Sequence, residues 1–182
     1  MESNSTIKTA VAKASLALRG LHWLMALAIV GASALIYADE MFVGHFALQK
    51  VLTHAHILVG LSVLVLVPLR LLLHWIRPLP PIVPAPPRWQ LRLQALAHVA
   101  LYVLMLATPS LGLLVAQSSG RRVAIFGVAL PALIGRDIGL SHAIEAVHEN
   151  LALALLGLVA VHAAAAIVHH LITRDNTLRR MI

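Results

Sequence analysis

The sequence has no cysteine, and only 7 of its 182 residues are Asp or Glu. Without cysteine, disulfides, iron–sulfur clusters, thiolate-ligated haem and haem attachment through a C-x-x-C-H motif are all excluded. Charged residues make up 12% of the chain and hydrophobic residues 60%, a balance outside that of soluble globular domains. The composition therefore predicts an integral membrane protein.

Four apolar runs are long enough to cross a bilayer, since a spanning helix needs about 20 apolar residues. They are residues 21–38, 51–75, 91–116 and 148–172. The expected fold is an all-α membrane bundle of four transmembrane helices, with residues 1–182 forming one domain. The first run is too long for the apolar region of a signal peptide and lacks a convincing cleavage site, so we expect an uncleaved first helix.

The basic residues are distributed unevenly between the two sides of the predicted bundle, and Lys and Arg near helix ends are retained on the cytoplasmic side. One side has Lys8, Lys13, Arg19, Arg70, Arg77, Arg88, Arg92, Arg174, Arg179 and Arg180; the other has Lys50, Arg121, Arg122 and Arg136. This predicts a multi-pass protein of the bacterial inner membrane with both termini cytoplasmic. The net charge of +7 is then explained by how the chain is oriented in the membrane. The sequence has no basic patch with interleaved aromatic residues that would indicate nucleic-acid binding.

The three connections between the runs differ in composition. Residues 39–50 form a short, mildly acidic link, and the proline-rich residues 76–90 predict a stiff cytoplasmic strap. Residues 117–147 form the longest connection and contain too many apolar residues for disorder. We expect an ordered cap over the outer end of the bundle, with a short helix near Ser141.

Histidines within the apolar runs are the main functional signal, because ionisable side chains at bilayer depth are costly unless something satisfies them. His148 and His162 lie fourteen residues apart on the last run, almost four turns, so both face one way at a separation of about 21 Å. His56 is predicted to lie at about the same depth in the membrane as His148. We expect this outer pair to hold a haem iron, with Gly60 leaving room for the ring and His54 pointing away.

The inner level has three candidates, His22, His98 and His162, whereas a bis-histidine haem needs two. We predict His22 and His162 as ligands and assign His98 to a hydrogen bond with a haem propionate or a quinone. Zinc is disfavoured, because the histidines separate into a pair and a trio and no H-E-x-x-H motif is present. Small residues (Gly31, Gly60, Gly112 and Gly157) are expected at helix contacts or beside a flat macrocycle.

In order and spacing, motifs along almost the whole chain resemble those of the bacterial cytochrome b561 family. They are Leu21-His22-Trp23, His56-Ile57-Leu58-Val59-Gly60, Arg70-Leu71-Leu72-Leu73, Pro80-Pro81-Ile82-Val83-Pro84, Ala97-His98, Phe126-Gly127, Pro131, His148-Glu149, His162-Ala163-Ala164-Ala165-Ala166, His169-His170 and Asp175-Asn176-Thr177-Leu178. The resemblance implies a four-helix bundle with two haem b groups, one near each membrane face, and agrees with His22, His56, His148 and His162 as ligands.

The resemblance also implies the activity. In the family member that the chain most resembles, two superoxide ions each give up one electron at the outer face, oxygen is released and ubiquinone is reduced to ubiquinol. The alternative is a cytochrome b membrane anchor that relays electrons between a hydrogenase or dehydrogenase partner and quinone. For the first activity we expect Arg121, Arg122 and Arg136 to steer superoxide. We expect Arg70, His74 and Trp23, with His98, near the quinone.

Overall fold

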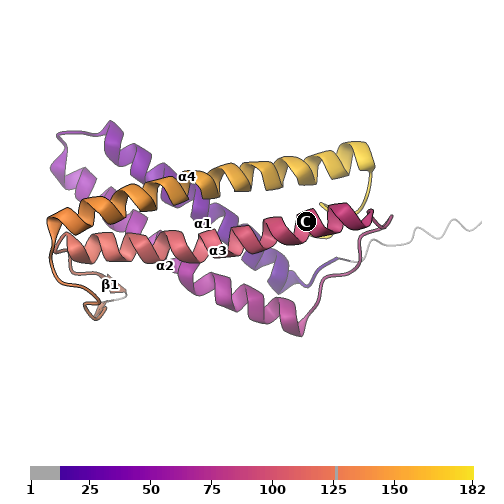
Figure 1. Ribbon diagram of the computed structural model, residues 1–182, viewed down its shortest axis with the longest axis horizontal. Helices are drawn as coiled ribbons and strands as arrows, with labels where there is room; N and C mark the ends of the chain where they lie inside the picture. Colours follow the sequence, from indigo (N-terminus) through magenta and orange to yellow (C-terminus); the bar gives the residue numbers. More distant parts are fainter. Residues whose placement is uncertain (1–12, 126) are drawn as a thin grey trace, which may run out of the picture.

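Four long helices run along the axis of the structure, a computed structural model that describes residues 13–125 and 127–182. They are α1 (Leu16–Met41), α2 (Phe46–Ile76), α3 (Arg88–Ser118) and α4 (Ile138–Val168), which continues as the π-helical turn η1 (His169–Thr173). All four are long and apolar enough to span a membrane, so the predicted four-helix membrane fold is confirmed (Figure 1). Lys8 and Phe126, used above for orientation and resemblance, lie outside the described residues.

Each helix extends beyond the apolar run that predicted it, and the largest correction concerns α4. This helix begins at Ile138 instead of residue 148, so Ser141 belongs to its first turns and not to a separate short helix of the cap. Asp137 caps the helix, because its side chain accepts a hydrogen bond from the Leu140 N–H at 3.0 Å. Hydropathy missed these turns because polar residues interrupt them, although the backbone is already helical.

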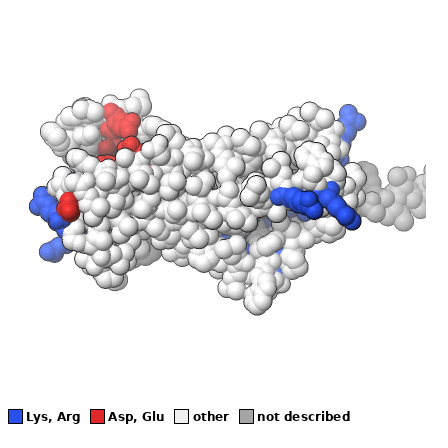
Figure 2. All heavy atoms as spheres, viewed as in Figure 1, with Lys and Arg blue, Asp and Glu red and all other residues white. Residues whose placement is uncertain are grey.

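The bundle consists of two helical hairpins, because α1 packs mainly on α2 and α3 mainly on α4. Contacts between α1 and α4 are few. A cluster of buried side chains from all four helices joins the hairpins midway along their length: Met25, Ile29, Val63, Val67, Leu101, Met105 and Leu155. Figure 2 shows charged side chains gathered at the two ends of the molecule, with an uncharged band between them, as a bilayer requires.

Residues 119–137 form the predicted cap at one end of the bundle. They include a two-stranded antiparallel hairpin, β1 (Ala124–Ile125) and β2 (Val128–Ala129), which is the small β component of an otherwise helical fold. The buried Gln117 side chain fixes the cap, since it donates to the Pro131 carbonyl at 2.9 Å and accepts from the Leu133 N–H at 2.8 Å. Val123 packs with Leu61 and closes this end.

Candidate functional site

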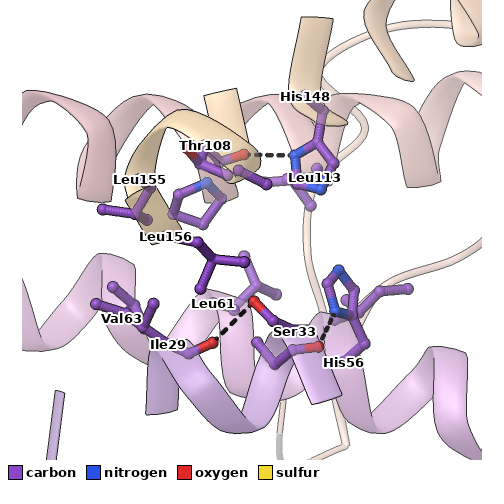
Figure 3. Close-up of a pocket in the computed structure, with 16 residues that line it drawn as sticks. Ile29, Ser33, His56, Leu61, Val63, Thr108, Leu113, His148, Leu155 and Leu156 are labelled. Atoms are coloured by element: carbon purple, nitrogen blue, oxygen red, sulfur yellow. Dashed lines mark hydrogen bonds between the residues drawn. The ribbon is translucent and has the colours of Figure 1, made fainter. Parts of the chain in front are cut away.

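His56 of α2 and His148 of α4 face one another between the two hairpins (Figure 3). Their ring centroids are 6.2 Å apart and their planes are nearly perpendicular, at 88°. A metal–imidazole bond of about 2 Å, plus about 1.1 Å from the nitrogen to the ring centre, places two axial imidazoles on one metal with centres roughly 6.3 Å apart. The spacing therefore suits one metal ion between the two rings.

Both rings are oriented through their Nδ1 atoms. The His56 Nδ1–H donates to the Ala32 carbonyl of α1 at 2.8 Å, and the His148 Nδ1–H donates to the Thr108 carbonyl of α3 at 2.9 Å. A hydrogen bond of this kind fixes the tautomer and leaves Nε2 free to bind a metal, which is the usual arrangement around ligating histidines. Each hairpin thus supplies one imidazole and the carbonyl that orients it.

An apolar pocket surrounds this outer pair and is lined by residues of all four helices (Figure 3). It encloses about 660 Å³ of empty space, counting its open mouth. Gly112 lies against the imidazole of His148, since a Cβ there would be 3.0 Å from Cε1. Gly60 opens into the same pocket with no atom within 4 Å of an added Cβ. The donors, the apolar lining and the two glycines beside the rings fit a flat macrocycle held by two imidazoles.

The inner level contains His22 of α1, His98 of α3 and His162 of α4. The centroids of His22 and His162 are 6.3 Å apart, whereas those of His98 and His162 are 5.3 Å apart. Only the separation of His22 from His162 matches the distance of roughly 6.3 Å expected between the centres of two imidazoles bound to one iron. The Nδ1–H of His98 donates to the Gln94 carbonyl of its own helix at 2.7 Å. The separation of His22 from His162 thus suits one metal ion between the two rings, as at the outer level, and His98 lies beside them.

The structure offers no competing metal centre within the residues that it describes. No group of three or more His, Cys, Asp or Glu side chains converges there on a point that could hold an ion. A structural zinc site needs four such ligands and a catalytic site usually three. Each level instead offers two imidazoles at a separation that suits one iron, with His98 as a third ring at the inner level, and two imidazoles are the donor set of a bis-histidine haem site.

Comparisons with known proteins point to one family. Residues 13–182 match the sequence profile described as Prokaryotic cytochrome b561. The chain is 33% identical over 166 residues to "Cytochrome b561 homolog 1" of Escherichia coli (strain K12), a match that covers 89% of this chain and 92% of that protein. It is 31% identical over 167 residues to "Probable superoxide oxidase CybB" of Yersinia pestis, which covers 90% of this chain and 92% of that protein.

This chain belongs to the prokaryotic cytochrome b561 family. A second Escherichia coli (strain K12) relative, "Cytochrome b561 homolog 2", is 29% identical over 170 residues, covering 88% of this chain and 86% of that protein. Membership makes the chain a multi-pass membrane redox protein that binds haem b.

The structure brings some of the other predicted residues of this cytochrome b561 chain to the inner level. Arg70 reaches from α2 to both neighbouring helices, because Nε donates to the Tyr102 hydroxyl at 3.3 Å and Nη1 to the Leu18 carbonyl at 3.3 Å. Trp23 lies edge-on to His22, with ring centroids 5.4 Å apart. His74 lies on the exposed side of α2.

At the opposite end, Arg121 and Arg122 are exposed where the chain leaves α3. Arg136, at the end of the cap, packs its side chain against Gly120, next to Arg121. The three predicted arginines thus come from the two ends of one cap. Gly120 adopts a φ of +88°, a conformation that a Cβ would strain.

The remaining histidines do not belong to either pair. His54 and His142 are exposed on helices, and His45 is exposed at the start of α2. His169 lies at the inner end of α4, where its Nδ1 is 2.5 Å from a carboxylate oxygen of Asp175. The preference for His56 over His54 agrees with their exposure.

Sequence reasoning missed several groups that shape the site. Thr108 supplies the carbonyl that orients His148, and its own buried hydroxyl has no partner among the described residues. Arg180, only 6% exposed, shares an apolar groove with His98 and the proline-rich strap. The position of Thr108 directly before Pro109 was a weak signal for the role of its carbonyl. Nothing in the local sequence indicates that Arg180 is buried.

Proposed function

We propose that this chain is a superoxide oxidase, a di-haem b enzyme that oxidises superoxide at its outer side and reduces ubiquinone to ubiquinol. The observation that supports this most strongly is the pairing of four histidines at two levels, with centroid separations of 6.2 and 6.3 Å. One relative, which matches most of the chain, is named "Probable superoxide oxidase CybB". The balanced reaction takes one electron from each of two superoxide ions and adds two electrons and two protons to one quinone.

The proposed ligands are His56 and His148 for the outer haem and His22 and His162 for the inner haem. Haem bound by these residues would supply reversible one-electron chemistry. The protein fixes the distance between the sites, about 21 Å along α4 from His148 to His162. The packed apolar cluster around Met105 and Leu155 excludes water between them.

The outer surface is proposed to attract superoxide through Arg121, Arg122 and Arg136. These side chains lie together where the cap begins and ends, and an opposite charge on the protein raises the encounter rate of a small anion. Acidic residues such as Asp39 and Glu40 at the neighbouring end of α1 limit the effect. The steering is therefore proposed to be local to the cap.

Ubiquinone is proposed to bind at the inner end, where His98, Arg70 and Trp23 gather. An apolar groove there is lined by the strap, by the first turns of α3 and by His98 and Arg180. Such a groove suits an apolar ring with polar groups for its carbonyl oxygens. His74, on the exposed side of α2, is proposed to contact the quinone at the same end.

The orientation is proposed to be that of an inner-membrane protein with both ends of the chain in the cytoplasm. The strap, Arg77, Arg88, Arg174 and Arg179 lie at the end that this assigns to the cytoplasm. The cap then faces the periplasm, so superoxide and ubiquinone meet opposite ends of the bundle.

The test is a steady-state assay with purified protein, a superoxide source and a soluble ubiquinone. We expect ubiquinol to form at one per two superoxide ions consumed, at a rate that depends on protein and exceeds spontaneous dismutation. No acceleration would refute the superoxide reaction. Haem reduction only after addition of a hydrogenase or dehydrogenase would instead favour the alternative role as a membrane anchor.

A further inference from the structure

The two haem levels differ in how their histidines are oriented. At the outer level each ring donates from Nδ1 to a backbone carbonyl of another helix. At the inner level, neither His22 nor His162 has a hydrogen-bond partner within the part of the chain that the structure describes. Ligating histidines usually need such a partner, so something else must orient the inner rings.

Trp23 occupies that role for His22. Its indole meets the imidazole of His22 edge to face, with the planes at 68° and the centroids 5.4 Å apart. The indole is itself fixed at its far end, because Nε1–H donates to the Met181 carbonyl at 2.8 Å. The rotation of His22 is therefore limited by a residue that is held from the other end of the chain.

Residues 175–182 provide a firm anchor for this contact. Asp175 is 2% exposed, and its carboxylate lies 2.5 Å from His169 Nδ1 and accepts from the Thr177 N–H at 2.8 Å. Although burial opposes ionisation, the hydrogen bonds from His169 and Thr177 lower the pKa of Asp175 below its ordinary value. The segment thus begins at a carboxylate that stays charged at neutral pH.

Further hydrogen bonds tie the segment to the strap and to the start of α1. The Asn176 amide oxygen accepts from the Val83 N–H at 2.8 Å, and its backbone N–H donates to the Val83 carbonyl at 3.2 Å. The Arg180 guanidinium donates to the Pro80 carbonyl, and its own carbonyl accepts from the Ala14 N–H at 3.0 Å. The Met181 carbonyl therefore has a fixed place relative to α1.

We propose that the 175–182 segment is a positioning element for the inner haem, which orients the ligand His22 through the hydrogen bond between Met181 and Trp23. The segment replaces the Nδ1 hydrogen bond that the outer histidines have. This inference rests on the proposed ligation of an inner haem by His22 and His162. It gives Trp23 a second role in addition to its proposed contact with the quinone.

Two variants remove the contact from opposite sides. Trp23→Phe keeps an aromatic ring but loses the N–H donor, and deletion of residues 181–182 removes the acceptor without altering Trp23. Trp75→Phe is the matched control, because Trp75 is 84% exposed on α2. The readouts are the low-spin electron paramagnetic resonance signals of the two ferric haems and the rate at which each haem transfers to apomyoglobin.

We expect both variants to lose the inner haem about tenfold faster than the control, the lower end of the effect of losing an outer-sphere partner. The resonance signal of that haem alone should shift, while the outer haem keeps its signal and rate. Equal losses from both haems, or no difference from Trp75→Phe, would overturn the proposal. So would a defect confined to ubiquinone reduction, since that outcome assigns Trp23 to the quinone.

The haem content of the unaltered protein separates this proposal from the one on which it rests. One haem per chain would refute the di-haem assignment itself. Two haems per chain, with no selective effect of either variant, would refute only the role of the 175–182 segment.

Discussion

Replacing Gly112 by alanine should selectively weaken the outer haem. The new Cβ would lie 3.0 Å from Cε1 and 3.3 Å from Nδ1 of His148. Since carbon atoms prefer separations of about 3.5–4.0 Å, the imidazole must retreat by roughly half an ångström. This retreat strains both the hydrogen bond to the Thr108 carbonyl and the bond to iron. We expect a loss of 10–100-fold in haem affinity, about 1.4–2.7 kcal/mol.

Gly157→Ala is the control, because it makes the same chemical change on α4 with no atom within 4 Å of the added Cβ. Alanine favours helix over glycine by about 1 kcal/mol, so the control should hold both haems and unfold at the same or a higher temperature. The assay is the dissociation rate of each haem, followed by transfer to apomyoglobin. If Gly112→Ala retains its outer haem as long as Gly157→Ala does, the imidazole of His148 does not need the space that Gly112 leaves.

Three further predictions concern single residues. His56→Ala should lose the outer haem and keep most of the inner one, while His22→Ala should do the reverse; haem content and spectra measure both, and a variant that loses the two haems equally would contradict independent sites. His98→Ala should keep two haems, because its 5.3 Å centroid distance to His162 is too short for a shared iron; loss of the inner haem would move the ligand assignment to His98. Docking of the 175–182 segment should be unchanged from neutral pH down to about pH 4 and weaken below it, because the pKa of Asp175 is lower in the folded chain than in the unfolded one and the stabilisation that this gives is lost as the pH falls through the folded value. Pepsin cleavage of the segment between pH 5 and pH 2 tests this, and Asp175→Asn should remove the transition.

The helical architecture follows from properties that the sequence states directly. Apolar length predicts the spans, and basic residues near their ends predict which connections lie on one side. The depths of His56, His148, His22 and His162 follow from counting residues along the helices, and the structure brings these four rings together in two pairs. The start of α4 could not be predicted this way, because its first turns extend past the apolar run.

The features that hold the rings in place depend on packing between distant segments. From sequence, Gly31, Gly112 and Gly157 look alike, yet only Gly112 of these three lies against a histidine. The carbonyls that orient His56 and His148 are backbone groups, which any residue carries, so no residue type marks them. The contact of Trp23 with Met181 joins positions 158 residues apart and needs the folded chain to be seen.

If four histidines hold two haem groups between the hairpins, the haem content of the purified protein will show it. Quantification as the pyridine haemochrome, together with the reduced and oxidised spectra, should give two haem b per chain, both low-spin with two nitrogen axial ligands. One haem per chain, or a high-spin spectrum that indicates an open coordination position, would contradict the account.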